Sequence, residues 1–353
     1  MLPAGGERRR PQHGPRSTLA LASRSGAMTE ASAVACVEAD RLPALSPEVV
    51  DAARGYSDAS RAASTRKKYL ASWLDFSAWC RAQGHEPLPA HPVVVAGYVA
   101  AEAARGLSPS AVQVRLAGIG WVHRRAGHQP PQRAETGAVI LEIMAGIRRK
   151  HGRPPARKAA ADADVVRDVL FHIHGQGLKD CRDRALIAFG SASCLRRSEL
   201  VALRVDDVVR VPEGMRVAIG RSKSDQEGKG ATIAVPDGRR LKPVAHLEAW
   251  LARGVADGWL FRRISNDGKT VTSDPMSDRA VARVVQARPA AAGLDPAAFA
   301  GHSLRAGFLT AAARAGASIF QMQAQSRHKS VQVLAGYVRS AKLFEDHAGR
   351  DFL

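Results

Sequence analysis

The sequence predicts a mainly α-helical protein of two domains, with a small β-sheet in the second domain. Apolar side chains recur with helical spacing through much of residues 57–150. A basic segment containing two adjacent prolines follows, and beyond it two short apolar stretches flank a polar turn. Together these features favour a helical first domain, a linker and a second domain of α+β type.

Length and composition indicate how many domains the chain can form and what kind of molecule it binds. The chain has 353 residues, of which 45% are apolar, so two ordinary cores are possible. No apolar run approaches the roughly 18 residues of a membrane span. The net charge is +19 and the isoelectric point is about 10.7, which favours a polyanionic partner and above all nucleic acid. A generally arginine-rich composition is the alternative explanation.

The cysteines indicate neither disulfides nor a metal site. Cys36, Cys80, Cys181 and Cys194 lack CxxC spacing and have no neighbouring histidine cluster. We therefore expect reduced cysteines, an intracellular protein and no bound metal. Residues 1–45 are rich in Ala, Ser, Gly, Pro and Arg without periodicity, which predicts a disordered extension.

The first domain is expected over residues 46–150 as a unit of four helices. Ser64 is predicted to cap the first helix, which carries Tyr69, Trp73, Phe76 and Cys80 on one face and ends at Gly84. The stretches "VVVAGYVAAEAARG" and "AVILEIMAGIRRK" predict the second and fourth helices. Ser108 and Pro109 begin the third helix, whose inward residues are predicted to be Val112, Leu116, Ile119 and either Val122 or His123.

Residues 151–163 are predicted to form a basic interdomain linker. Pro154 and Pro155 prevent a helix there. The linker is either a solvated hinge or a segment that lies on a phosphate backbone. In the second case the DNA-contacting residues in and next to it would be Arg148, Arg149, Lys150, Arg153, Arg157 and Lys158.

The second domain is expected over residues 164–353. "RDRALIAFGSAS" and "RRSELVALRVDDV" are interpreted as helices, and "MRVAIG" and "ATIAVP" as short strands. The polar turn "RSKSDQEGKG" lies between the strands, and residues 240–350 are interpreted as mostly helical. Neither a phosphate-binding GxxxxGK[ST] loop nor a GxGxxG motif is present.

The second domain concentrates groups suited to a phosphodiester. Two arginines could hold its non-bridging oxygens, histidines could donate hydrogen bonds, a lysine could protonate the departing alkoxide, and a phenolate could attack phosphorus. Acidic pairs that would hold magnesium are lacking. Each residue alone has an ordinary structural explanation, and only their order carries weight: Arg196, Lys223, His302, Arg305, His328 and Tyr337.

That order resembles the tyrosine recombinases, the phage-integrase family of site-specific recombinases. "SCLRRSELVALRVDDV" is similar to the first-arginine motif, "VAIGRSKSDQ" to the hairpin with its lysine, "GHSLRAGFLTAAARAG" to the H-x-x-R box and "MQAQSRHKSVQVLAGYVR" to the terminal motif. "STRKKYLASWLDFSAWCRAQG" and "SPSAVQVRLAGIGWVHRRAGHQPP" resemble helices of the SAM-like core-binding domain. The resemblance extends over about residues 50–345.

By this resemblance the catalytic residues are Arg196, Lys223, His302, Arg305, His328 and Tyr337, and Glu199 supports Arg196. Lys229 competes with Lys223 for the hairpin role, and Lys223 is preferred because it follows the strand directly. The sequence departs from the family pattern at two positions. Cys194 and Arg327 stand where the family usually has glycine, at the edges of the first and last motifs.

The resemblance implies an enzyme with a SAM-like helical core-binding domain and an α+β catalytic domain. Tyr337 would cut DNA and form a 3′-phosphotyrosine without metal, ATP or other cofactor. The enzyme would act as a homotetramer on two double-stranded DNA sites in the cytoplasm, associated with the nucleoid, with the tail "SAKLFEDHAGRDFL" docked on a neighbouring subunit. The alternatives are a catalytically inactive DNA-binding accessory protein of recombinase ancestry and a metal-dependent nuclease.

Overall fold

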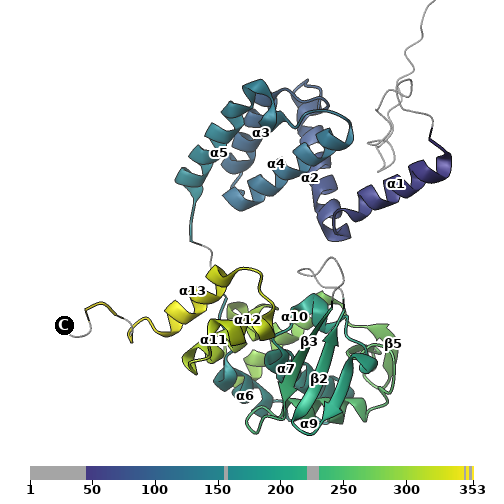
Figure 1. The fold of residues 1–353 in the computed structure, drawn as a ribbon, viewed down its shortest axis with the longest axis vertical. Helices are drawn as coiled ribbons and strands as arrows, with labels where there is room; N and C mark the ends of the chain where they lie inside the picture. Colours follow the sequence, from purple (N-terminus) through teal and green to yellow (C-terminus); the bar gives the residue numbers. More distant parts are fainter. Residues whose placement is uncertain (1–44, 155–157, 221–229, 346, 350–351) are drawn as a thin grey trace, which may run out of the picture. The chain divides into compact units, whose positions relative to one another are not determined.

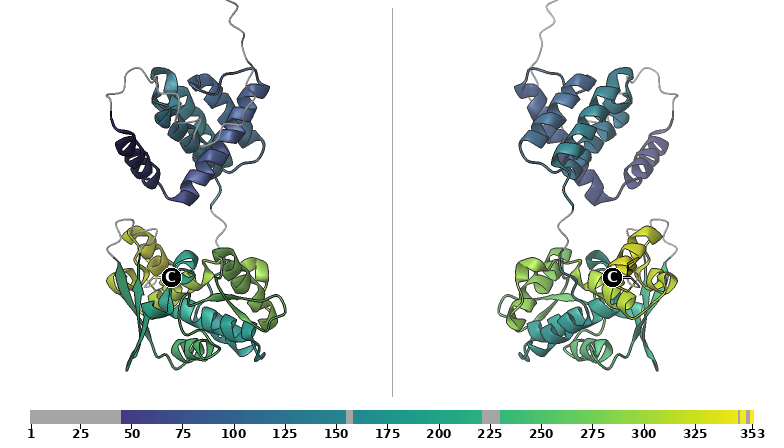
Figure 2. Two further views of the ribbon diagram at one scale, coloured as in Figure 1. Left: turned by 90° about the vertical axis from the view of Figure 1, so that its right-hand side faces the viewer. Right: turned by 90° about the vertical axis from the view of Figure 1, so that its left-hand side faces the viewer.

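The chain divides into two compact units, residues 1–155 and 156–353 (Figures 1 and 2). The computed structural model describes residues 45–154, 158–220, 230–345, 347–349 and 352–353. Apart from its last residue, the extension predicted to be disordered over residues 1–45 lies outside this part. None of the described helices is both long enough and apolar enough to cross a bilayer.

The secondary-structure elements of the first unit, in the residues described, are all helices. It contains α1 (Pro47–Ala59), α2 (Ala63–Ala82), α3 (Pro92–Ala104), α4 (Pro109–Arg125), the short 3-10 helices η2 (Pro131–Arg133) and η3 (Glu135–Gly137), and α5 (Ala138–His151). The helices predicted for α2, α3, α4 and α5 are confirmed. The predicted start of α4 is also confirmed, because the Ser108 hydroxyl accepts a hydrogen bond from the Ala111 amide at 3.3 Å.

The core of the first unit is built from residues of α2, α3, α4 and α5. Trp73 and Phe76 of α2 are buried, as are the residues of α4 predicted to face inward: Val112, Leu116, Ile119, Val122 and His123. The two helices approach closely at Gly118. A Cβ atom there would lie 2.9 Å from the Ser72 Cβ and 3.0 Å from the Tyr69 carbonyl oxygen, so glycine permits this packing.

The predicted start of the first helix at Ser64 is wrong, and α1 was not predicted. α2 begins at Ala63, directly after α1 and a short turn. None of the side chains of α1 is fully buried, so this helix adds little to the apolar core of the unit. Tertiary ion pairs anchor it instead: the Asp58 carboxylate lies 3.5 Å from the Arg66 guanidinium and 2.8 Å from that of Arg125.

The second unit combines helices with two small antiparallel sheets. Its first half contains α6 (Ala163–Phe171), α7 (Leu178–Ser193), α8 (Arg197–Leu200), η4 (Val205–Asp207), β1 (Val208–Val211), β2 (Gly214–Ile219) and β3 (Ala231–Pro236). Its second half contains α9 (Pro243–Leu251), β4 (Arg262–Ile264), β5 (Val271–Pro275), α10 (Asp278–Ala287), η5 (Arg288–Ala292), η6 (Pro296–Ala298), α11 (Ser303–Arg314), α12 (Ile319–Ser326) and α13 (Val331–Ala341).

The two predicted strands are confirmed as β2 and β3. They pair antiparallel, with Met215 opposite Val235 and Val217 opposite Ile233, and β1 pairs with the other edge of β2. These four side chains are buried in the main core of the unit, which also contains residues of α7 and α9. The alternation of buried and exposed residues along β2 and β3 is that of a sheet with one covered face.

For the second unit, one further prediction is wrong and another, that residues 240–350 are mostly helical, is incomplete. "RRSELVALRVDDV" is not one helix, because α8 ends at Leu200 and the chain continues through η4 into β1. Val208, the last residue of this stretch, begins β1 and lies opposite Val217 of β2. Residues 240–350 also contain the β4–β5 hairpin, whose turn includes Asp267 and Gly268, with Gly268 at φ +77°. An Asp-Gly pair is a common hairpin turn.

Helices α11, α12 and α13 lie side by side in the second unit (Figure 1). They share a small apolar cluster with the end of α7, formed by Cys194, Leu309, Ala313, Met322 and Leu334. Gly307 of α11 lies against the backbone of Ala161, where any Cβ atom would clash with the Ala161 carbonyl group. This contact places α11, which follows the predicted His302, against the segment that leads into α6.

Candidate active site

Arg196 and Glu199 form one half of the candidate site, at the start of α8. The Arg196 amide donates to Glu199 Oε2 at 2.8 Å, and Arg196 Nη1 donates to Glu199 Oε1 at 2.7 Å. Arg196 is the N-cap residue of this one-turn helix, so the buried carboxylate caps the helix and orients the guanidinium together. The structure thus joins the two residues that the sequence paired.

Arg305 forms the other half and is only 5% exposed. Its guanidinium donates to the carbonyl oxygens of Cys194 and Ser326, which lie at the carboxyl ends of α7 and α12. Carbonyl groups at helix ends lack intrahelical partners and carry the negative end of the helix dipole. Two helix ends therefore hold a cation that burial alone would disfavour.

The two departures from the family pattern both lie at left-handed backbone positions. Cys194 ends α7 at φ +55° and Arg327 ends α12 at φ +56°. Glycine adopts this conformation without strain, which explains why the family pattern has glycine at both places. In this chain a thiol and a guanidinium occupy them at a backbone cost of about 1–2 kcal/mol each.

Arg327 takes part in the site through Glu199. Its Nη2 atom donates to Glu199 Oε2 at 2.6 Å, and the Glu199 side chain is 3% exposed. Burial by itself would raise the pKa of Glu199. The hydrogen bond from the Arg196 amide and the charges of Arg327 and Arg196 outweigh that effect and hold the pKa below its usual range. The sequence marked Arg327 only as a departure, and this contact was not predicted.

His328 lies beside Arg305 and is held as a neutral imidazole. Its Nδ1 atom is 3.3 Å from Arg305 Nη2 and 2.8 Å from Ser326 Oγ. Burial, followed by the charges of Arg305, Arg196 and His302, lowers the pKa of His328 to about 4. A guanidinium can only donate, so Nδ1 accepts and the ring proton is on Nε2. The ring therefore offers one N–H donor to a ligand.

His302 and Tyr337 belong to the same group of helices. His302 is exposed and directly precedes α11, and its charge acts on His328. Tyr337 lies on α13, partly buried against the apolar cluster that contains Cys194 and Leu309. The charges of Arg196, Arg305 and His302 thus all act on His328. The helix of Tyr337 is anchored on the apolar cluster beside them.

The remaining predicted residues are less completely described. Lys223 and its competitor Lys229, in the segment between β2 and β3, lie outside the described residues. Arg157, in the predicted linker, also lies outside them. Arg148, Arg149 and Lys150 are exposed in the last turn of α5, and Arg153 is exposed just beyond it. Lys158 is exposed, but its ammonium donates to the Ala297 carbonyl oxygen at 2.7 Å, within the second unit.

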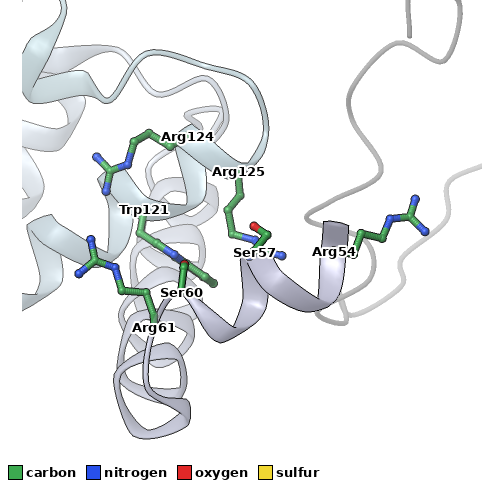
Figure 3. A pocket seen from close by; sticks show the side chains of 7 residues that line it. All are labelled: Arg54, Ser57, Ser60, Arg61, Trp121, Arg124 and Arg125. Atoms are coloured by element: carbon green, nitrogen blue, oxygen red, sulfur yellow. The ribbon is translucent and has the colours of Figure 1, made fainter. Parts of the chain in front are cut away.

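A basic cavity of about 410 Å³ lies in the first unit (Figure 3). The residues that line it are Arg54, Ser57, Ser60, Arg61, Trp121, Arg124 and Arg125. The Arg125 guanidinium lies over the Trp121 ring, 5.1 Å from its centroid, and is paired with Asp58. The sequence did not predict this cavity, because α1 supplies part of its wall. Among the described residues, no three histidine, cysteine or acidic side chains cluster as a metal site would require.

Comparison with known proteins identifies the family. The sequence profile of the phage integrase family matches residues 161–343, more than half of the chain. The chain belongs to the phage integrase family. Within this family it is 32% identical over 292 residues to an integrase/recombinase XerD homolog of Selenomonas ruminantium, covering 82% of this chain and 85% of that protein. It is 29% identical over 296 residues to recombinase Cre of Escherichia phage P1, covering 78% and 84%.

Solved structures of phage integrase family recombinases share the fold. XerH site-specific recombinase bound to palindromic difH matches with a TM-score of 0.59 at 16% identity, over 80% of this chain and 78% of that one. A lambda integrase dimer bound to a COC′ core site matches with a TM-score of 0.53 at 17% identity, over 82% and 92%. The predicted fold class is confirmed. As a tyrosine recombinase, the chain has site-specific recombination as its general function, as the sequence predicted.

Proposed function

We propose that this recombinase cuts and rejoins double-stranded DNA through a 3′-phosphotyrosine on Tyr337. The observation that carries the proposal is the meeting of Arg196, Arg305 and a neutral His328, supplied by three separate segments of the second unit. Two guanidinium groups and a neutral N–H donor suit a phosphodiester, whose charge increases as phosphorus becomes five-coordinate.

In the cleavage step the Tyr337 oxygen attacks the scissile phosphorus. A bond forms between this oxygen and phosphorus, the bond from phosphorus to the 5′ oxygen breaks, and the phenol proton passes to water. Arg196 and Arg305 neutralise the non-bridging oxygens, and the Nε2–H group of His328 donates to one of them. His302 donates a further hydrogen bond. Lys223, which lies outside the described residues, protonates the departing 5′ oxygen.

In the rejoining step the bond between Tyr337 and phosphorus is broken, and a bond from phosphorus to a second DNA strand is formed. The 5′-hydroxyl of the partner duplex attacks the phosphotyrosine, and Tyr337 leaves with its oxygen. The phosphate ester is exchanged at each step, so neither ATP nor another energy source is consumed. Side-chain cations supply the charge neutralisation that a metal ion provides in other phosphoryl-transfer enzymes.

Basic surfaces of the described residues support DNA as the substrate. Exposed cations at the end of α5 and the arginines of the cavity in Figure 3 provide positions for backbone phosphates. Leu343, Phe344, Phe352 and Leu353 near the carboxyl end are strongly exposed apolar side chains. They support docking of this tail on a neighbouring subunit of a homotetramer, acting on DNA in the cytoplasm.

A suicide substrate with a nick near the scissile phosphate tests the proposal. Wild-type protein should form a covalent protein–DNA adduct, and Tyr337→Phe should form none while keeping its affinity for DNA. Tyr69→Phe, in the first unit, is the matched control and should form the adduct. DNA binding without any wild-type adduct would favour the alternative of a catalytically inactive accessory protein.

A further inference from the structure

Arg327 brings a second guanidinium group to a carboxylate that already serves Arg196. Its Nη2 atom lies 2.6 Å from Glu199 Oε2, the oxygen that also accepts from the Arg196 amide at 2.8 Å. The Arg327 side chain is 13% exposed and that of Glu199 is 3% exposed, so solvent screens this ion pair only weakly. The contact joins the residue before His328 to the start of α8.

The charges of Arg196, Glu199 and Arg327 do not sum to zero. Glu199 carries one negative charge, whereas Arg196 and Arg327 carry one positive charge each, and Arg196 Nη1 lies 2.7 Å from Glu199 Oε1. If glycine stood at position 327, Glu199 would offset the charge of Arg196 alone. With Arg327 present the trio has a net charge of +1. Inside a protein, where the effective dielectric constant is low, a full unit of charge acts strongly on a nearby anion.

We propose that Arg327 is a positioning residue that neutralises Glu199, so that the charge of Arg196 remains available to the scissile phosphate. The inference rests on the proposed function, because it assigns Arg327 a part in that same reaction. Arg327 acts through Glu199 and need not touch the DNA. Its left-handed backbone, a conformation that favours glycine, is the structural cost of placing a guanidinium there.

The variants separate charge from backbone conformation. Arg327→Gly removes the charge and relieves the backbone, whereas Arg327→Asn removes the charge but keeps a side chain that tolerates the left-handed region. Lys242→Gly is the matched control, because Lys242 also has a positive φ (44°) and is exposed, at the start of α9. It should cleave DNA at the wild-type rate.

Single-turnover cleavage of the nicked substrate is the first measurement. Arg327→Gly and Arg327→Asn should each lower the cleavage rate constant by about tenfold or more, with little change in DNA affinity. Glu199→Gln in the Arg327→Gly background restores the net charge of +1, so the double variant should cleave faster than Arg327→Gly alone. If Arg327 had a purely structural role, the double variant should cleave more slowly than Arg327→Gly, since it also loses the contact between Glu199 and Arg196. A double variant that cleaves no faster than Arg327→Gly would overturn the inference.

A substrate with a neutral methylphosphonate at the scissile position gives a second readout. Its phosphorus carries one negative charge less, so the loss caused by Arg327→Gly should shrink to less than about threefold. Equal losses on both substrates would mean that Arg327 only supports the fold, against the inference.

The DNA-free protein gives a third measurement that does not depend on cleavage. Thermal unfolding of wild type, Arg327→Gly, Glu199→Gln and the double variant forms a cycle, in which the two substitutions should be non-additive. Additive effects would contradict the pairing. If wild-type protein formed no adduct at all, the proposed function would fail, and this cycle would still decide whether Arg327 neutralises Glu199.

Discussion

Protonation of His328 offers a direct test of the site geometry. The ring lies against the Arg305 guanidinium, and burial together with the charges of Arg305 and Arg196 lowers its pKa to about 4 from an ordinary value of 6.5. A histidine with a lowered pKa favours the folded state only while it is neutral. Its contribution to stability is therefore complete above pH 6.5 and is lost as the pH falls from 6.5 toward 4.

The size of this loss follows from the two pKa values. At pH 5 the imidazole of an unfolded chain is almost fully protonated, whereas about one folded molecule in ten carries the proton. The corresponding loss in the free energy of unfolding is at most about 2 kcal/mol relative to pH 8. His328 is only partly buried, and solvent screening reduces the expected loss to about 1 kcal/mol.

His328→Asn is the matched variant, because the Asn side-chain oxygen can accept from Arg305 and does not titrate in this range. Urea unfolding of the second unit between pH 8 and pH 5 should show a steeper loss of stability for wild type than for the variant. The ring resonances of His328, assigned by their absence in the variant, should titrate near pH 4 in the DNA-free protein. Cleavage at subsaturating DNA should show no His328 titration above pH 5.5.

Two results would refute this reasoning. One is a His328 resonance that titrates at or above pH 6, which would mean that the ring does not face Arg305 in solution. The other is a pair of parallel stability curves for wild type and His328→Asn. Either result would also remove the argument that the ring proton is on Nε2 and available to the phosphate.

Three further predictions concern the reaction and the first unit. Arg305→Lys should lower the cleavage rate by at least about 100-fold in a single-turnover assay, because lysine lacks the planar fork that holds two carbonyl oxygens and, in the proposed reaction, the phosphate. A rate within tenfold of wild type would contradict this role of Arg305. Cleavage should continue in EDTA, because cationic side chains supply the charge neutralisation, and activity that disappears and returns with added magnesium would contradict this. Phe76→Ala should destabilise the first unit by about 3–5 kcal/mol, measured by hydrogen exchange of α2 and α4 in the full chain, since Phe76 is fully buried in the core of this unit. Unchanged protection would contradict this packing.

Much of the secondary structure follows from local sequence. The start of α4 was predictable because Ser108 caps the helix through its own hydroxyl and Pro109 suits the first turn. The strands β2 and β3 were predictable because one face of each is buried and the other exposed. Where such local signals were weak or overlooked, prediction failed: α1 has no buried face, α8 ends after one turn, and the Asp-Gly turn of β4–β5 was missed.

The sequence by itself determined the family, the order of the candidate catalytic residues and the two positions where glycine is replaced. Only the tertiary structure decided what those replacements do. Arg305 is held by the carbonyl group of the left-handed Cys194 and by that of Ser326, just before the left-handed Arg327. The side chain of Arg327 reaches Glu199, which is distant in the sequence. The physical reason is that a capping motif depends on neighbouring residues, whereas a buried ion pair depends on which distant segments the apolar cores bring together.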